Sequence, residues 1–416
     1  MKEIKSKMSS LEQEALFNDC INNNTNLQDY LKLNNLNNED FRYKSYPEIK
    51  ISNNEFQLLE KTPKTDHQVP AISFFAGAGG FDVGFDYAGF NTLAAFEINE
   101  IFCKTLKLNF PKKDIFNADL RDKQKIYDLL KNYIGIDAPF EGVFHGGPPC
   151  QSFSIAANQR FSKDGNNFKR VGFEHSEYGN LLSDYIWYIQ QFRPKVFIIE
   201  NVPGLFEIDN GEQLFKELDK LANYGYSIAK PKILNVADYG VPQNRTRLFV
   251  VGSRDAKEFV FPIKNNYKTP CFHVFEKNLE NIDNHEVRVH KADSLIRYMQ
   301  LEYGQRDHLG RIDRLNPEQP SKTVIAGGLK GGGRSHLHPY FPRTLSAREC
   351  ARLQTFPDSY VFTGPSARQF TQIGNAVPPL FAYKLGIEIY KQFFNNINTK
   401  NKKQELLLEE FAEMSV

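Results

Sequence analysis

The residue with the clearest chemical potential is Cys150, in the stretch "VFHGGPPCQSFS" from Val143 to Ser154. A short apolar run leads into two glycines and two prolines, and these residues suit neither a helix nor the interior of a strand. The pattern predicts a rigid loop that leaves the end of a strand and presents Cys150 at its bend. A thiolate presented in this way is a nucleophile, whereas most single cysteines are small buried hydrophobes. The rest of the sequence is needed to distinguish a nucleophilic Cys150 from a buried structural one.

Three more charged residues have types and positions that suit catalysis. Glu200 ends the apolar run in "IIENVPG", where burial should raise a carboxyl group's affinity for its proton. A buried structural carboxylate that hydrogen-bonds the loops is the alternative. Arg245 and Arg247 in "PQNRTRLF" alternate along the start of a predicted strand, so both point to one side. A lone R-x-R is commonly a surface salt-bridge pair, so the neighbouring residues must show whether these two side chains do more.

A second group of residues predicts a site for a nucleoside-containing cofactor. The glycine-rich turn "FFAGAGG", Phe74 to Gly80, follows a predicted strand and opens a helix, whose N-terminal amides favour a carboxylate or another electronegative group. Glu97 ends the next predicted strand, where a carboxylate can accept two ribose hydroxyl groups. No Gly-Lys-Ser/Thr ends the turn, which disfavours a phosphate-binding P-loop. The spacing alone leaves a dinucleotide and S-adenosylmethionine both open.

The elements that must position these residues alternate between short apolar strands and helices. Helices are predicted from about Phe81 and over 180–192, and strands over 71–75, 92–97, 114–119, 142–145, 194–200 and 247–253. Near-continuous apolar strands separated by helices indicate an α/β fold with a mostly parallel sheet covered on both faces. Ligands of such sheets bind beyond the carboxyl ends of the strands, where the glycine turn, Glu97, Asp119, Cys150 and Glu200 all lie.

The regions outside this alternation differ in composition. Residues 1–69 are rich in asparagine and predict an accessory extension with short helices near 11–17 and 27–33. The alternation also stops over 254–342, which predicts a second, smaller domain. Its run 321–339 has two lysines, one arginine and no acid, so Lys322, Lys330 and Arg334 would track phosphates, unless the run is a plain flexible hairpin. Helical spacing resumes over 344–358, a Gly/Pro turn leads into a long helix within 372–394, and 397–416 is a charged tail.

Composition excludes several classes of protein. The 52 basic and 50 acidic residues give a net charge of +2, so the overall charge does not by itself indicate a nucleic-acid partner. The five cysteines are scattered and form no C-x-x-C pair, which argues against a disulfide framework or a cysteine-rich zinc site. No apolar run approaches the roughly 18–20 residues of a membrane-spanning helix, and no signal-peptide pattern opens the chain.

Seven ordered blocks of this sequence resemble a known family. They are "FFAGAGG", "FEIN", "GGPPCQSFS", "ENVPGL", "QNRTRLFVVG", "TLSARECARLQTFPD" and "QIGNAVPP". In this order they are similar to the DNA (cytosine-5) methyltransferases, of the bacterial restriction–modification type. The resemblance covers about 70–253 and 320–394. It implies a Rossmann-like S-adenosylmethionine-dependent methyltransferase domain over 70–253 and 343–396, with helices on both faces of its sheet, and a target-recognition domain over 254–342.

The resemblance also implies a role for each matching residue. Cys150 would add to C6 of a flipped cytosine, Glu200 would donate to N3, and Arg245 and Arg247 would hold the base. The cofactor S-adenosylmethionine, which leaves as S-adenosylhomocysteine, would contact Phe75, Ala76, Gly77, Gly79, Glu97, Ile98, Asp119, Leu120, Asn375 and Val377. Contacts to DNA would come from Gln151, Ser154, Arg160, Lys163, Lys322, Lys330 and Arg334. No metal is expected. The polar stretch 159–180 would close over the flipped base.

Two departures from the family pattern bear on the cofactor pocket. Ser73 stands where aspartate is frequent, and Ala118 precedes Asp119 where glycine is common. Neither change removes a reacting group.

The expected partner is double-stranded DNA, with a cognate restriction endonuclease acting independently, no membrane contact and a monomeric enzyme. The expected location is the bacterial cytoplasm, on the nucleoid through DNA. An RNA (tRNA) cytosine-5 methyltransferase of the same fold would share every motif. A zinc deaminase is disfavoured because Phe153 stands where P-C-x-x-C needs its second cysteine. A DNA-binding module without catalysis is the third alternative. The target sequence is not readable from the chain.

Overall fold

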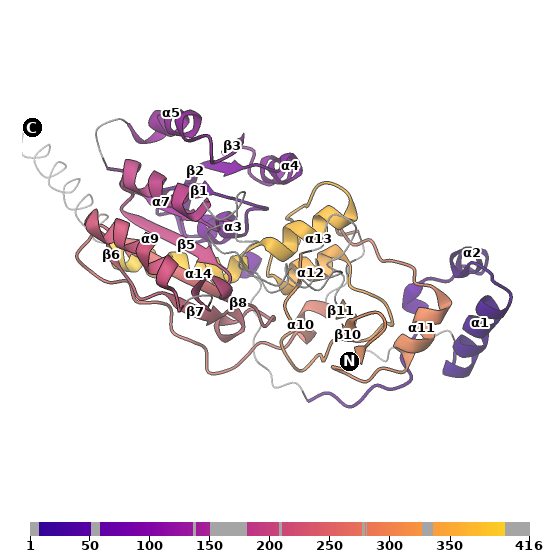
Figure 1. The fold of residues 1–416 in the computed structure, drawn as a ribbon. Helices are drawn as coiled ribbons and strands as arrows, with labels where there is room; N and C mark the ends of the chain where they lie inside the picture. Colours follow the sequence, from indigo (N-terminus) through magenta and orange to yellow (C-terminus); the bar gives the residue numbers. More distant parts are fainter. Residues whose placement is uncertain are drawn as a thin grey trace, which may run out of the picture. The chain divides into compact units, whose positions relative to one another are not determined.

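The computed structural model describes residues 8–50, 59–135, 139–149, 181–207, 210–276, 279, 281–326 and 336–395 of the 416-residue chain. These residues divide into two compact units. The first, which we call the sheet unit, comprises 61–239, 246–264 and the chain from Val377. The second unit comprises the chain up to Glu60 together with 240–245 and 265–376. Figure 1 shows the elements of both units, which are described separately below.

The sheet unit is organised around one eight-stranded sheet. Its strands follow the order β3-β2-β1-β4-β5-β8-β6, and β7 also pairs with β8. The first five strands in this order are parallel, and β8 runs antiparallel to β5, β6 and β7. The bounds are β1 Val69–Phe74, β2 Phe90–Glu97, β3 Asp114–Asn117, β4 Val143–Gly146, β5 Val196–Asn201, β6 Ser227–Ile228, β7 Lys232–Asn235 and β8 Thr246–Ser253.

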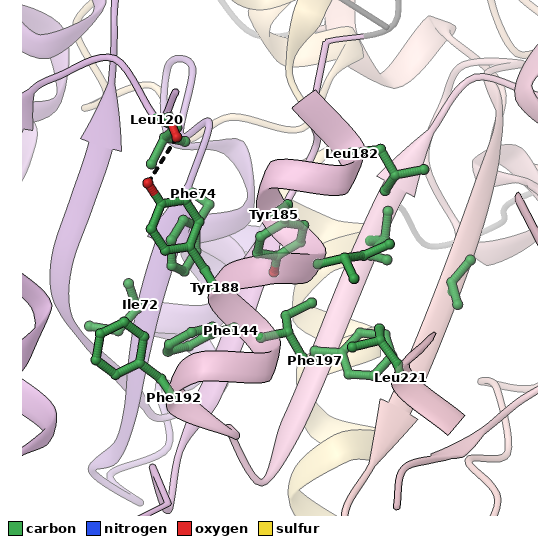
Figure 2. Packing of buried hydrophobic residues seen from close by; sticks show 14 of the residues in the cluster. Ile72, Phe74, Leu120, Phe144, Leu182, Tyr185, Tyr188, Phe192, Phe197 and Leu221 are labelled. Atoms are coloured by element: carbon green, nitrogen blue, oxygen red, sulfur yellow. Dashed lines mark hydrogen bonds between the residues drawn. The ribbon is translucent and has the colours of Figure 1, made fainter. Parts of the chain in front are cut away.

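Helices cover both faces of this sheet because successive strand residues point to opposite sides. Ile72 and Phe74 of β1 pack with residues of α5 (Lys123–Ile134), α7 (Leu181–Phe192) and α9 (Glu212–Asn223). Figure 2 shows α7 laying Tyr185, Tyr188 and Phe192 over the strand side chains. The other face carries α3 (Gly80–Tyr87), α4 (Glu100–Asn109) and α14 (Pro379–Ile389), with α14 packed directly on α3. A short helix, α8 (Gly204–Glu207), follows β5, a 3-10 turn spans Val236–Tyr239, and a π-helical turn (Tyr390–Phe394) extends α14.

The mostly parallel sheet and the six predicted strands are confirmed, with ends within a few residues of the predicted ones. The short strands β6 and β7 were not predicted, since two to four residues carry too little periodicity. The Gly/Pro turn that was expected to lead into a long helix within 372–394 is present, but it covers only 376–378. The segment up to Asn375 ends helix α13 (Ser366–Asn375), and a new helix starts at Pro379. Pro378 and Pro379 have no N–H to donate, so the chain cannot remain one helix through them.

The second unit combines two segments that are far apart in the sequence. Its helices are α1 (Ser10–Asn22), α2 (Leu27–Leu33), α10 (Phe272–Phe275), α11 (Ala292–Met299), α12 (Ala347–Leu353) and α13, and a 3-10 turn spans Asn38–Asp40. A small sheet has the order β11-β10-β9, with β9 Arg306–Asp307, β10 Ile312–Arg314 and β11 His336–Leu337. In this division, residues 8–50 and 343–376 belong to the same compact unit as 265–342.

The first two helices are well specified by sequence. Ser9 and Glu12 form a capping box at the start of α1, and the Asn26 side chain accepts the N–H of Gln28 at α2. In the part of the chain that the structure describes, no helix is long and apolar enough to cross a membrane.

The contact between α3 and α14 tests the fold. A Cβ at Gly84 of α3 would come 2.5 Å from Ala382 Cβ and 2.6 Å from Tyr383 N, and it would also meet Pro379 O. We therefore expect Gly84→Ala to lower the free energy of unfolding by about 1–3 kcal/mol through overpacking. Thermal unfolding followed by circular dichroism measures this. The control is Lys104→Ala on α4, whose side chain is 61% exposed; equal melting temperatures for the two variants would contradict the packing.

Candidate active site

The glycine-rich turn between β1 and α3 has an unusual backbone. Phe75, Gly77 and Gly79 all have positive φ angles, of 51°, 57° and 75°. Glycine adopts this conformation freely, but for a phenylalanine it is strained, and such strain clusters at ligand sites. A Cβ built on Gly77 would meet nothing within 4 Å, so open space lies beside the turn. The turn thus offers a cradle at the N-terminus of α3.

Glu97 closes one side of this cradle from the end of β2. Its Oε2 accepts the N–H of Gly77 at 2.9 Å and its Oε1 accepts the N–H of Asn99 at 2.8 Å. The side chain is buried, and this burial raises the pKa of the carboxyl group, although the backbone donors oppose the shift. Each carboxylate oxygen keeps a further lone pair, so the group can still accept hydroxyl donors. The neighbouring side chain of Ile98 is 61% exposed.

Asp119 and Leu120 follow β3 at the same end of the sheet. The Arg121 guanidinium donates to both carboxylate oxygens of Asp119, which lowers the pKa of that carboxyl group. Leu120 is buried, and its carbonyl oxygen accepts the Tyr188 hydroxyl at 2.8 Å, the dashed line in Figure 2. The N–H of Ala118 donates to Glu97 O at 3.0 Å, so the ends of β2 and β3 are tied together.

The Ser73 departure has a structural counterpart on α3. The Ser73 hydroxyl donates to Asp82 Oδ2 at 3.0 Å, and both side chains are buried. His145 of β4 lies on the same face between Phe81 and Phe85, where burial lowers its pKa to about 4. The carboxylate that binds the Ser73 side chain of β1 is therefore Asp82 of α3. This hydrogen bond attaches α3 to β1. No local pattern points to Asp82, because its partner Ser73 lies nine residues away on a different element.

Glu200 and Arg247 meet at the ends of two adjacent strands. Arg247 Nε lies 3.1 Å from Glu200 Oε1, and the carboxyl group is buried at the end of β5. Glu200 Oε2 faces Gly147, where a Cβ would lie only 2.7 Å away. Asn201 donates through Nδ2 to Pro148 O at 3.3 Å. Glu200 and Asn201 thus hold Gly147 and Pro148, the described start of the loop that leads to Cys150.

Arg245 belongs to the second unit rather than to β8. It is buried, and its Nη1 donates to Val324 O at 3.4 Å. Gln243 links this segment to two others. Its Nε2 donates to Gln354 Oε1 at 2.8 Å, and its Oε1 accepts the N–H of Val324 at 2.9 Å. Of the expected catalytic residues, the structure pairs Glu200 with Arg247. Gln243 was missed as a positioning residue, although it opens the same quoted block.

The remaining predicted residues fall into two sets. Asn375 ends α13 in the second unit, and Val377 is buried in the sheet unit ahead of α14. Lys322 is 63% exposed and pairs with Asp313 at 2.9 Å. Several residues lie outside the described ones, as does the stretch 159–180: Cys150, Gln151, Ser154, Arg160, Lys163, Lys330 and Arg334. Among the residues that are described, no group of three or more His, Cys, Asp or Glu side chains is arranged to hold a metal ion.

The strand order, the glycine turn at β1 and the acidic residue at the end of β2 define a methyltransferase-type α/β fold. The family model for C-5 cytosine-specific DNA methylases matches residues 69–391 of this chain. The chain therefore belongs to the C-5 cytosine-specific DNA methylase family and is a DNA (cytosine-5-)-methyltransferase family enzyme. This family uses S-adenosylmethionine as methyl donor.

Similar proteins cover most of the chain. The type II methyltransferase M1.HphI of Haemophilus parahaemolyticus is 33% identical over 350 residues, covering 78% of this chain and 87% of its own. The type II methyltransferase M.Eco47II of Escherichia coli is 30% identical over 399 residues, covering 88% and 87%.

Solved structures share the fold at lower identity. A putative DNA modification methyltransferase encoded within an E. coli prophage has a TM-score of 0.60 at 24% identity, covering 79% of this chain and all of that one. A DNMT2 variant of Spodoptera frugiperda has a TM-score of 0.55 at 15% identity, covering 77% and 100%.

The contacts of Glu97 predict a role in cofactor affinity. Glu97→Gln replaces one acceptor oxygen by an NH₂ group, which cannot accept from both Gly77 and Asn99 and leaves one buried donor unpaired. We expect the Kd for S-adenosylmethionine to rise at least about tenfold, measured by titration calorimetry. Glu100→Gln on α4 is the matched control, because Glu100 is exposed and pairs only with Lys104 in the described contacts. Equal affinities in the two variants would exclude Glu97 from the cofactor site.

Proposed function

We propose that this enzyme transfers a methyl group from S-adenosylmethionine to C5 of a flipped cytosine in a specific short duplex DNA sequence, through a covalent bond between Cys150 and C6. The observation that carries the proposal is the Glu200 carboxyl group. It is buried, paired with Arg247, and held against Gly147 at the start of the loop leading to Cys150.

The chemistry requires a nucleophile because C5 of cytosine does not react with a methyl donor unaided. Addition of the Cys150 thiolate to C6 breaks the C5–C6 double bond, and C5 becomes nucleophilic. A proton from Glu200 at N3 offsets the negative charge that this addition places on the ring. C5 then takes the methyl group, with S-adenosylhomocysteine as the leaving product. A water molecule takes the C5 proton, departure of the Cys150 thiolate restores the C5–C6 double bond, and N3 returns its proton to the Glu200 carboxylate.

The arginines support this step in different ways. Arg247 lies 3.1 Å from Glu200 and fixes the direction of its carboxyl group, and the same guanidinium group adds positive charge beside the base. Arg245 would also hold the base, as the resemblance implies. Gln243, two residues before it, ties this segment to Val324 and Gln354.

S-adenosylmethionine fits the cradle at the end of β1 and β2. The open space beside Gly77 admits a ligand, the amides at the start of α3 suit its carboxylate, and Glu97 can accept its ribose hydroxyl groups. When bound, the cofactor supplies an electrophilic methyl group. Its further contacts would come from Phe75, Ala76, Gly79, Ile98, Asp119, Leu120, Asn375 and Val377, as the family resemblance implies.

The second unit would recognise DNA, with Lys322, Lys330 and Arg334 near the backbone, and the stretch 159–180 would close over the flipped cytosine together with Gln151, Ser154, Arg160 and Lys163. The relatives M1.HphI and M.Eco47II are named as type II methyltransferases. That likeness supports a role in a restriction–modification system, in which a monomeric enzyme in the bacterial cytoplasm protects host DNA from a separate endonuclease.

The first test is methyl transfer from labelled S-adenosylmethionine to genomic duplex DNA that lacks cytosine methylation, beside tRNA and beside the Cys150→Ala variant. Label recovered as 5-methylcytosine in DNA, and lost in the variant, supports the class of substrate and the nucleophile. Label in tRNA alone would replace the DNA proposal with an RNA one. Sequencing the modified DNA then gives the target.

Glu200→Gln tests the proton donor separately from the fold. The amide keeps the shape of the side chain but cannot deliver the proton to N3, so kcat should fall by about 10²–10⁴. The Kd for S-adenosylmethionine should be unchanged. Glu207→Gln on α8 is the control, since Glu207 is exposed seven residues further along the chain. A Glu200→Gln variant with the kcat of the control would remove Glu200 from the mechanism.

A further inference from the structure

The N-terminal segment, residues 8–50, shares a hydrophobic core with the rest of the second unit. Leu16 and Phe17 of α1 and Leu31 of α2 belong to one buried cluster with Leu295 and Met299 of α11. Ile312 of β10 and Leu337 of β11 complete it. The helix α1 packs directly on α11. A core of this kind is formed by residues almost 300 positions apart, so the N-terminal segment is not an appended tail.

A buried arginine of the small sheet depends on the same segment. Arg314 of β10 is fully buried, with its guanidinium carbon 3.6 Å from the Tyr43 ring centroid and 4.2 Å from that of Tyr303. It donates to Ser45 O at 3.0 Å, and also to Leu301 O and Pro339 O. Burial of a guanidinium group is costly unless acceptors and aromatic rings replace the solvent, and among the described residues Nη2 of Arg314 finds no acceptor. The N-terminal segment supplies one of these acceptors and the closest aromatic ring.

Further contacts tie this segment to the region around α11 and α12. The Tyr43 hydroxyl donates to His338 O at 2.8 Å, and the N–H of Lys44 donates to Met299 O at 2.9 Å. Arg343 donates to Glu39 at 2.8 Å and to both oxygens of Glu349. Burial alone would raise the pKa of Glu349, but the Arg343 charge and hydrogen bonds lower it to about 2. The whole network therefore holds α11, β10 and the start of α12 in place from the N-terminal side.

The held elements also present positive charge to solvent. Arg288 and Lys291 are exposed and line a groove at the start of α11, together with Ser294, Tyr298 and Ile312. Within the described residues, neither Arg288 nor Lys291 forms a salt bridge with an acidic side chain. Two of the groove residues, Tyr298 and Ile312, are members of the core shared with the N-terminal segment. Any shift of that core therefore moves the groove.

We infer that the N-terminal segment is a structural part of the DNA-recognition unit, and that Tyr43 is a positioning residue which holds β10 and α11 in the geometry that binds DNA. This inference rests on the proposed function, since it assigns DNA recognition to the second unit. The cofactor cradle of Gly77 and Glu97 lies in the other compact unit. Loss of the Tyr43 contact should therefore weaken DNA binding and spare cofactor binding.

The test uses full-length variants. Tyr43→Leu removes the ring that stacks on Arg314 and the hydroxyl that reaches His338. We expect KM for duplex DNA to rise about tenfold, with kcat at saturating DNA and the Kd for S-adenosylmethionine unchanged. Tyr43→Phe keeps the ring and should restore most of the affinity. Leu33→Ala on α2 is the control within the same segment, because that side chain is 86% exposed.

Arg314→Lys examines the same contact from β10, since lysine keeps the charge but lacks the planar group that stacks on Tyr43. It should raise KM for DNA in the same way, and it decides the question if Tyr43→Leu does not fold. A folded variant with unchanged KM for DNA would overturn the inference. Equal losses of DNA and cofactor affinity would also overturn it. Absence of DNA methylation by the unaltered enzyme would instead refute the proposed function itself.

Discussion

The site depends on one close approach, between the Glu200 carboxyl group and the backbone at Gly147. A Cβ at that position would lie 2.7 Å from Glu200 Oε2, so any larger residue would displace the carboxyl group from its place against the loop. The two strands are parallel and paired, from Val143 with Val196 to Gly146 with Ile199, which fixes where each one ends. The sheet register thus sets the distance between the Glu200 carboxyl group and the segment that leads to Cys150.

The two buried carboxyl groups at these strand ends are compensated in different ways. Removing a charge from water costs several kcal/mol unless partners replace the solvent. Glu97 accepts hydrogen bonds from the backbone N–H groups of Gly77 and Asn99, whose positions are set by the main chain. Glu200 receives the Arg247 side chain, whose charge is available to a bound base. The compensation of Glu97 is thus part of the backbone, whereas that of Glu200 comes from a charged side chain.

The features that could be predicted from the sequence are those that depend on residues close together in the chain. The six strands, the turn at Phe74–Gly80 and the positions of Glu97 and Glu200 were predictable, because each depends on a local pattern of apolar residues, glycine and proline. The pairing of Ser73 with Asp82 replaces a carboxylate expected on β1 by one on α3, and no local pattern announces it. The end of α13 at Asn375 was also missed, since the glycine before it suggested a turn. Gly374 packs against Ile325 and Ala326 instead, a contact set by tertiary structure.

The N-terminal segment shows the same limit most clearly. Its caps and short helices were readable, because Ser9, Glu12 and Asn26 act within one turn of the chain. Its polar, asparagine-rich composition nevertheless predicted an accessory extension, since the apolar residues are few. Several of them, including Phe17, Leu31 and Phe41, are buried in one cluster with residues from 292 to 337. A short segment that cannot form a core alone becomes ordered by completing another. The N-terminal segment and the elements α11 and β10 therefore stabilise each other, and a substitution on either side of this core affects the packing of the other side.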